Sequence, residues 1–407
     1  MRRMACAATL VAAVSGCSDP AGVLQPQDDA QPSTSRASRA AKAADKTGYE
    51  VVTFSSSLGG TVSRGNGLNP RGWVAGFSNL PDGTRHAALW RDGAVTDLGT
   101  LGGPHSSVAW PGINNRGLVV GIAQTATLDP LGELWSCVAF FPTVTGNTCL
   151  GFVWEDGVMT ALPTLGGNNG YAASVNSRGQ VVGWAETPVH DPTCDAPQVL
   201  QFRAVLWEPK RGLVQELPPL PGDSASAATA INQRGQVVGI SGECDQAVGR
   251  FTAQHAVLWD KGTVTELPNL GGESWHTPTA INERGDVVGF SNPPGDVDGS
   301  FIAHAFLWTR KGGIRDLGTL PGDEISQAQA INARGQVVGV SCGATCRAFL
   351  WDDGVMWDLN TLVEPGFAGT LVSARDLTNS GRITGDVLVQ SAGTVVPYVA
   401  TPRSGKP

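Results

Sequence analysis

The chain has 407 residues, of which 41% are hydrophobic and 16% are charged. This hydrophobic content excludes a globally disordered chain, and so low a charge content is unusual for a helical or coiled-coil protein. The 36 acidic residues outnumber the 28 lysines and arginines, which gives a net charge of −8. A protein that binds the phosphates of nucleic acid needs the opposite balance, so we expect no nucleic-acid partner.

The N-terminus has the pattern of an export signal. Met1-Arg2-Arg3 is a short positive region, and the apolar run from Ala5 to Val14 is too short to span a bilayer. Small residues then precede Cys17, and residues 1–17 resemble the signal peptide of bacterial lipoproteins. The resemblance implies that Cys17 is acylated and that the protein is located at the outer membrane, in the periplasm or at the cell surface. The alternative is an ordinary secretory signal with a chance cysteine.

The next segment, residues 18–47, is rich in Ala, Ser, Gln, Pro and Asp and has no apolar periodicity. This composition predicts a flexible tether with a reach of roughly 30 Å. No later stretch has the roughly 18 uninterrupted apolar residues of a membrane helix. We therefore expect attachment to the membrane through the lipid alone, and a folded domain over residues 48–402.

That domain is predicted from one repeated unit. Residues 280–289 read AINERGDVVG and residues 330–339 read AINARGQVVG. Each unit continues with an apolar strand that closes on tryptophan and then with Leu-x-x-Leu-Gly-Gly or a Pro-Gly variant. The tryptophans, which we expect in the core, are Trp90, Trp154, Trp207, Trp259, Trp308 and Trp351. The anchoring asparagines are Asn69, Asn114, Asn176, Asn232, Asn282 and Asn332, with a shortened version of the motif at Asn379.

Each unit has the pattern of four strands, which in the sixth unit cover about 327–332, 336–341, 346–351 and 355–359. Asn-x-Arg-Gly suits a tight hairpin turn, because Asn bonds the backbone ahead and Gly takes the left-handed conformation. Val-Val-Gly and Phe-Leu-Trp are apolar on consecutive residues, as expected of strands that are buried on both faces. Four-stranded units of about 50 residues fit the blades of a β-propeller.

The two ends of the domain complement each other. Tyr49–Phe54, followed by Leu58-Gly59-Gly60, has the pattern of a fourth strand with its connector, and residues 372–400 supply strands one to three. Joined, they make a seventh blade and leave no blade with an unpaired side. We therefore predict an all-β, seven-bladed propeller with four antiparallel strands per blade, the last blade closed by the N-terminal strand. An open solenoid is the alternative.

The repeated words resemble a known family. His255-Ala256-Val257-Leu258-Trp259, His304 to Trp308, and Asp316-Leu317-Gly318-Thr319-Leu320 are similar to the bacterial extracellular HAF repeat. The resemblance covers about residues 49–400 and implies an exported repeat protein without an established reaction. Arg203 and Arg347 replace the histidine in two units, which indicates a shared hydrogen-bond donor that holds the blade rather than a catalytic group.

Six cysteines follow Cys17, all between the second and third strands of a blade. They are Cys137, Cys149, Cys194, Cys244, Cys342 and Cys346. An even number in an exported chain indicates disulfides, although six cysteines allow 15 pairings. Cys342 with Cys346, and Cys137 with Cys149, lie close in sequence, which leaves Cys194 for Cys244 in the neighbouring blade. A zinc site at Cys-x-x-x-Cys is the rival, but no histidine lies at a comparable spacing beside it, so we expect no metal.

The loops between second and third strands are long in blades two to five, at about 124–149, 186–202, 242–253 and 292–302. They open on the face of the Leu-x-x-Leu-Gly-Gly connectors, and loops often carry function. Exposed aromatic side chains there could stack on sugar rings or anchor a partner, or they could only cover their own loops. The candidate ligand-binding residues are His105, Trp110, Trp135, Phe140, Phe141, His190, Trp275 and His276.

The opposite face carries arginines at one position of six hairpin turns. They are Arg71, Arg116, Arg178, Arg234, Arg284 and Arg334. A ring of guanidinium groups could bind anions. We favour ion pairs with acids of the adjacent turns, such as Asp92 and Asp260.

The sequence lacks the common motifs of hydrolases, metalloproteases and nucleotide-binding proteins. We therefore expect a monomeric binding or scaffold module for an extracellular protein or polysaccharide, without a cofactor. One alternative is a propeller hydrolase or lyase acting on extracellular glycan, with His105, His190 and His276 as acid–base candidates. Another is a purely structural envelope protein.

Overall fold

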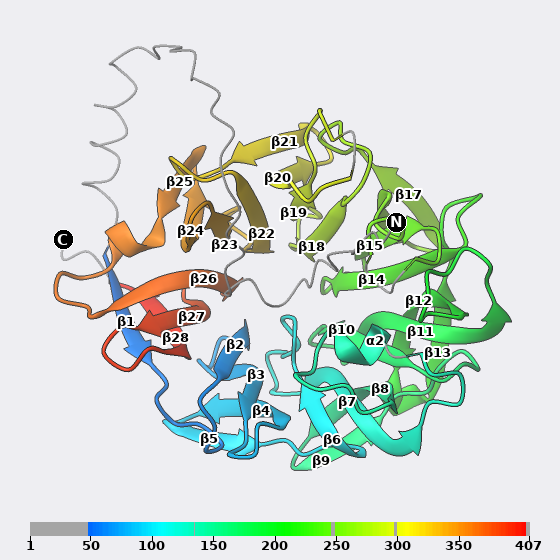
Figure 1. Cartoon of the computed structure of the whole chain (residues 1–407). Coiled ribbons are helices and arrows are strands. Elements are labelled where there is room, and N and C mark those ends of the chain that lie inside the picture. Colours follow the sequence, from blue (N-terminus) through cyan, green and yellow to red (C-terminus); the bar gives the residue numbers. More distant parts are fainter. Residues whose placement is uncertain (1–47, 134, 246–248, 297–298, 404–407) are drawn as a thin grey trace, which may run out of the picture.

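The computed structural model describes residues 48–133, 135–245, 249–296 and 299–403. Within these residues the chain forms seven sheets of four antiparallel strands, arranged as blades around a central axis (Figure 1). The predicted seven-bladed β-propeller is confirmed. The signal peptide 1–17 with Cys17 and the tether 18–47 lie outside the described residues.

The first four blades follow one another along the chain. Blade one contains β2 (Ser63–Leu68), β3 (Val74–Asn79), β4 (Arg85–Arg91) and β5 (Ala94–Asp97). Blade two contains β6 (Gly102–Ser107), β7 (Val119–Leu128), β8 (Asn147–Glu155) and β9 (Val158–Ala161). Blade three contains β10 (Gly170–Val175), β11 (Val181–His190), β12 (Leu200–Glu208) and β13 (Leu213–Leu217). Blade four contains β14 (Ala225–Ile231), β15 (Val237–Gly242), β16 (His255–Asp260) and β17 (Thr263–Leu267).

The last three blades complete the ring. Blade five contains β18 (Thr277–Ile281), β19 (Val287–Ser291), β20 (His304–Thr309) and β21 (Gly313–Gly318). Blade six contains β22 (Ile325–Ile331), β23 (Val337–Cys342), β24 (Cys346–Asp352) and β25 (Val355–Asp358). Blade seven contains β26 (Gly369–Leu377), β27 (Ile383–Val389), β28 (Thr394–Pro402) and β1 (Tyr49–Thr53). The one-turn helix α2 (Trp135–Val138) and the 3-10 turns η1 (Pro209–Arg211) and η2 (Leu359–Leu362) lie outside the sheets.

The two ends of the domain close the ring as predicted. Strand β1 pairs antiparallel with β28, with Tyr49 opposite Pro402 and Thr53 opposite Tyr398. Figure 1 shows β1 beside β28 in the blade that also contains β26 and β27. Pairing across the two ends excludes the open solenoid. Among the described residues, no helix is long and apolar enough to cross a bilayer.

The hydrophobic core lies mainly between neighbouring blades. Val182 and Leu206 of blade three, for example, share a buried cluster with Ala228, Val237 and Trp259 of blade four. Because each blade packs on two neighbours, its strands are covered on both faces. This packing explains why the repeated words are apolar on consecutive residues instead of alternating.

The repeated asparagine ties each blade to the next. Asn232 Oδ1 accepts hydrogen bonds from the backbone N–H groups of Arg234 and Gln236, both at 3.0 Å, which closes the hairpin turn. Its Nδ2 donates to the backbone carbonyl of Asn282 in the next blade at 3.0 Å. The same link between turns joins Asn69 to Asn114, Asn114 to Asn176, Asn176 to Asn232, Asn282 to Asn332, and Asn332 to Thr378.

The expected position of the shortened motif in blade seven is wrong by one residue. Thr378 occupies the place of the anchoring asparagine, because its Oγ1 accepts from the backbone N–H of Arg382 at 3.0 Å. Asn379 lies one position later, where its Oδ1 accepts from the backbone N–H of Ala333 in blade six at 2.9 Å. Gln233 makes the equivalent bond to the backbone N–H of Ser177. A threonine hydroxyl thus replaces the amide that the sequence pattern led us to expect.

The histidine of the Trp strand holds the third strand of a blade to the fourth, as predicted. His304 Nδ1 lies 2.9 Å from Asp316 across β20 and β21, and this hydrogen bond raises the pKa of His304. Where arginine replaces histidine, Arg347 Nη1 donates to Asp358 at 3.1 Å. The same cross-strand pairing of a donor with an acid therefore serves both residue types.

The partner expected for the turn arginines is different. Arg178 Nη2 donates to Gln180 Oε1 at 2.6 Å, and Arg284 pairs with Asp286 at 2.7 Å. Arg178, Arg284 and Arg334 thus contact the residue two positions later in their own turns. The short span of the turn favours this local contact.

The asparagine link predicts a stability effect. Replacing Asn232 with Ala removes the acceptor of the Arg234 and Gln236 N–H groups and one donor to the Asn282 carbonyl, and should lower the free energy of unfolding by about 2 kcal/mol or more. Asn232→Asp keeps the acceptor of the turn and removes the donor that serves both Asn282 in blade five and, at 2.8 Å, Gln236 Oε1 in the same turn. Chemical denaturation measures both, with Thr265→Ala, at an exposed position of the same blade, as control. An Asn232→Asp protein as stable as the wild type would show that this bond between blades contributes nothing.

Candidate functional site

The long loops of blades two to four pack together instead of standing free in solvent. Phe140, which follows the short helix α2, stacks on Tyr171 with ring centroids 4.9 Å apart, and Tyr171 stacks on Trp184 at 4.4 Å. Phe202 and Ala253 belong to the same buried cluster. Loop and strand residues of blades two to four therefore share one buried cluster.

Three disulfides fasten this face, with the predicted pairing. They join Cys137 to Cys149, Cys194 to Cys244, and Cys342 to Cys346. The residues of the second pair are 50 positions apart, so by chain entropy this bond contributes about 4 kcal/mol, against about 2 kcal/mol for the third, whose residues are 4 apart. Disulfides persist in oxidising compartments, which agrees with export.

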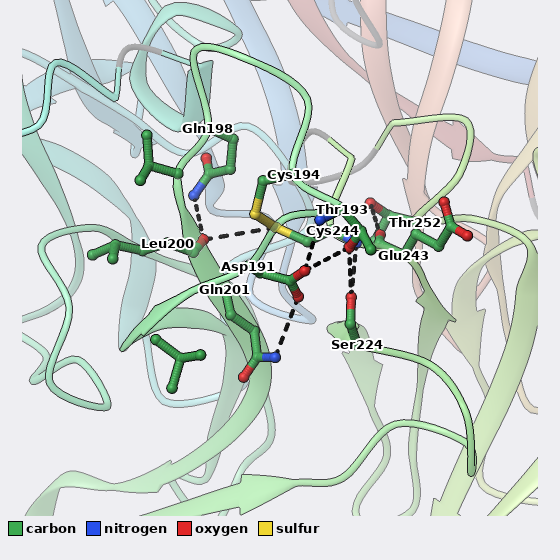
Figure 2. The surroundings of a disulfide bond; sticks show 12 residues. Asp191, Thr193, Cys194, Gln198, Leu200, Gln201, Ser224, Glu243, Cys244 and Thr252 are labelled. Carbon is green, nitrogen blue, oxygen red and sulfur yellow. Dashed lines mark hydrogen bonds between the residues drawn. A yellow bond between two sulfur atoms is a disulfide. The ribbon is translucent and has the colours of Figure 1, made fainter.

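Figure 2 shows the disulfide that links the loops of blades three and four. Beside it, the backbone N–H of Cys244 donates to the hydroxyls of Thr193 and Ser224 at 3.0 and 3.1 Å. Asp191 lies next to the two sulfurs. Among the described residues, Asp191, Cys194 and Cys244 form a group whose side-chain types and spacing could hold a metal ion. Zinc binds thiolates, and sulfurs joined in a disulfide do not supply them.

Most of the candidate residues predicted on this face are buried, so the expectation that they are exposed is wrong for five of them. Their exposed fractions are 1% for His105, 2% for Phe140, 6% for Phe141, 7% for Trp275 and 1% for His276. The reason is that the loops cover their own aromatic side chains. Of the remaining candidates, Trp110 is half-buried and His190 is exposed at the end of β11. Trp135 begins α2, and its side chain lies outside the described residues.

The two buried histidines have both ring nitrogens engaged. His276 Nε2 donates to the carbonyl of Gly272 at 3.1 Å, and its Nδ1 lies 2.7 Å from the hydroxyl of Ser291. Burial lowers the pKa of His276 to about 4. His105 Nδ1 accepts from the backbone N–H of Arg85, and its Nε2 contacts the hydroxyl of Thr143. These neutral imidazoles act as structural bridges, without a proton accessible to a substrate.

A cavity lies where the innermost strands of the blades face one another. It is lined by Arg64, Asn66, Phe77, Ala109, Trp110, Pro111, Thr279, Phe290, Gln329 and Arg375. These residues come from blades one, two, five, six and seven, so the cavity, here named the axial pocket, lies on the axis of the ring. Among the predicted ligand-binding residues whose side chains the structure describes, only Trp110 lines it.

One structural device places side chains in the axial pocket. Each innermost strand except that of blade two shifts register at a bulged residue three positions before the anchoring Asn or Thr, and β26 of blade seven also shifts between Leu371 and Ser373. The bulged residues are Asn66, Ala173, Thr229, Thr279, Gln329 and Arg375. In blade two the irregular stretch is longer, and Ala109–Pro111 line the pocket. Bulges re-aim side chains, here toward the axis.

The glycine of Val-Val-Gly makes room for each bulge. A Cβ added at Gly239 would overlap the carbonyl oxygen of Ala227, on the strand it pairs with, and one added at Gly289 would overlap the carbonyl oxygen of Thr277. Sequence reasoning missed the bulged residues because no motif contains them. The available signal was the position itself, which varies from one unit to the next while its neighbours repeat.

The axial pocket contains more positive than negative charge. Arg64 Nη1 lies 3.0 Å from Asp386 Oδ2, and Arg375 Nε lies 3.5 Å from the same oxygen. The side chain of Asp386 is completely buried, whereas those of Arg64 and Arg375 are 17% and 22% exposed. Burial, followed by repulsion from Arg64, lowers the pKa of nearby Arg85 to about 10. Two guanidinium groups therefore share one carboxylate at the pocket wall.

A pair of buried carboxyl groups lies under the long loops of blades two and three. Gln198 Nε2 bridges them, at 3.3 Å from Glu133 Oε1 and 3.0 Å from Glu186 Oε1. Glu186 Oε2 also accepts from the backbone N–H of Asn169 at 2.8 Å. Burial first, and then the negative charge of Glu133, raise the pKa of Glu186 to about 7. The pair links the two loops and makes their contact sensitive to pH.

Sequence comparison does not place the chain in a family. No family model matches it, and no curated protein does. The resemblance to the HAF repeat therefore stays a prediction.

Solved structures are similar in architecture. The acylaminoacyl peptidase of Pyrococcus horikoshii has 13% sequence identity and a TM-score of 0.45, and the match covers 79% of this chain and 49% of that one. Dipeptidyl peptidase 4 of Porphyromonas gingivalis has 10% identity and a TM-score of 0.39, covering 79% and 50%. The lectin SapL1, solved with alpha methyl fucoside, has 12% identity and a TM-score of 0.35, covering 76% and 99%. This chain spans about half the length of the two peptidases, and at these values the likeness says nothing about its chemistry.

The raised pKa of Glu186 predicts how stability depends on pH. Between about pH 4.5 and 7 the folded protein holds a proton that the unfolded chain has released, so the free energy of unfolding falls as pH rises through this window. The loss is up to about 3 kcal/mol. Because glutamine does not titrate, the free energy of unfolding of the wild type minus that of Glu186→Gln, measured by urea denaturation from pH 5 to 8, should fall as pH rises. Glu155→Gln, at an exposed ion pair, is the control. A difference that stays constant with pH would contradict the assignment.

Proposed function

We propose that the chain is an exported, lipid-anchored binding module that recognises an extracellular polysaccharide or protein through its loop face and axial pocket. The observation that carries this proposal is the axial pocket. Five blades contribute side chains to it, and the closed ring holds them in place. A rigid scaffold that presents a few polar groups and one partly exposed aromatic ring is typical of a recognition site.

The location rests on separate observations. The signal-peptide pattern that ends at Cys17 supports lipid anchoring, and three disulfides support an oxidising compartment. The HAF-like words support membership in an exported repeat family. Labelling of expressing cells with palmitate tests the anchor: the wild-type chain should incorporate the label and Cys17→Ala should not. A label retained by Cys17→Ala would contradict acylation at this residue.

The engaged nitrogens of His105 and His276 are the reason to favour binding over hydrolase or lyase chemistry. An exposed histidine remains at His190, on the outer part of β11. No residue of the axial pocket is a carboxylate that could pair with it for acid–base work. We therefore infer recognition without turnover.

The binding function is tested by screening the full chain against arrays of glycans and of envelope proteins. A ligand that the wild-type chain binds on these arrays should bind the Trp110→Ala variant much more weakly. Trp110 lines the pocket, and part of its side chain is exposed. Trp73→Ala is a matched control, since Trp73 is also half-buried but packs under Arg71 on the turn face, which is the face of the Asn-x-Arg-Gly hairpin turns. Turnover of a glycan by the wild type, or equal losses in both variants, would contradict a receptor that uses this pocket.

A further inference from the structure

The strongest unexplained feature is a group of charges at a position that is apolar elsewhere. Asp386 lies opposite Ser373 in blade seven, and the corresponding residues of blades four, five and six are Ile240, Phe290 and Val340. A buried ion pair is seldom more stable than a well-packed apolar residue, so this exchange is not explained by stability alone. It places a carboxylate where it can orient two arginines.

Arg375 is the surplus charge in this group. The carboxylate of Asp386 already accepts from Arg64 at 3.0 Å and from the hydroxyl of Ser373 at 2.9 Å. Arg375 lies at 3.5 Å from the same oxygen, at the longer distance, and its side chain is the more exposed of the two arginines. A guanidinium group held in a pocket beside a carboxylate oxygen that already has two nearer donors is suited to bind an anion from solvent.

The size of the pocket restricts what can enter. About 20 Å³ is open to the centre of a water molecule, which is space for one or two waters. A planar carboxylate fits this space and matches the fork of a guanidinium group, whereas a whole sugar ring does not fit. The ligand must therefore present its carboxylate on a larger body that stays outside.

The rest of the lining favours a sugar as that body. Phe77 and Phe290 are buried, with 2% and 1% exposed, so they offer no open pocket for the last side chain of a peptide. The accessible lining combines the indole of Trp110 with the polar side chain of Gln329. An aromatic face beside an amide group suits a pyranose ring and its hydroxyls.

Resting on the binding function proposed above, we propose that the axial pocket recognises a uronic acid of an extracellular polysaccharide. Arg375 and Arg64 bind its carboxylate, and its ring lies against Trp110. Asp386 is a positioning residue that holds the two guanidinium groups in place.

Isothermal titration of the full chain with trigalacturonic acid tests this inference. The acid should bind, and its methyl ester, of similar size but without charge, should bind at least about tenfold more weakly, because a hydrogen bond between charged groups is lost. Arg375→Gln should weaken binding of the acid to a similar extent. Arg211→Gln, whose side chain is 70% exposed at the turn face, should not change it.

The Arg375→Gln variant is expected to fold, since Asp386 keeps Arg64 and Ser373 as partners. If it does not fold, the comparison of acid with ester on the wild type still decides. Equal affinity for acid and ester, or tighter binding of a hexapeptide through its free C-terminal carboxylate, would overturn the uronate assignment while the binding function stands. The absence of any ligand in the arrays would instead overturn the binding function.

Discussion

The pairing of β1 with β28 is the constraint on which the rest of the structure depends. It joins the start of the domain to its last blade, with Tyr49 opposite Pro402, and so forces blade one against blade seven. Only then do Arg64 and Asp386, 322 residues apart in the chain, come within 3.0 Å. The axial pocket is therefore a product of closure, and no single repeat contains it.

The fold could be predicted because the residues that build it recur. Three examples come from blade four, and each has a role that recurs around the ring. Asn232 bonds the next turn, Gly235 adopts a positive φ of 85° in the hairpin, and Trp259 is buried in the core. Prediction failed where a different residue type makes the same hydrogen bond as the repeated residue. Thr378 supplies with a hydroxyl what asparagine supplies elsewhere with an amide, and the neighbouring asparagine Asn379 misled the alignment.

The candidate site was harder to predict, for two physical reasons. Aromatic residues on long loops indicated a binding face, but loops tied by disulfides bury their own aromatic rings, as Phe140 does against Tyr171. The residues that do line the pocket reach it through bulges, and a strand pattern with a period of two does not reveal a bulge. Arg375 would have been found by asking which position differs while its neighbours repeat.

The departures from the repeat are concentrated in the last blade, and they divide into two roles. Thr378 has no side-chain amide that could donate to the turn of blade one. Between blades seven and one, Asp376 instead accepts from the backbone N–H of Leu68 at 2.7 Å, and Asp386 pairs with Arg64. These contacts replace the missing link and hold the ring shut. Closure does not depend on Arg375, because Asp386 Oδ2 has nearer donors in Arg64 and Ser373, and Asp376 accepts from the backbone N–H of Leu68. Arg375 therefore lies in a pocket that closure of the ring creates, and its guanidinium group is available to bind a ligand.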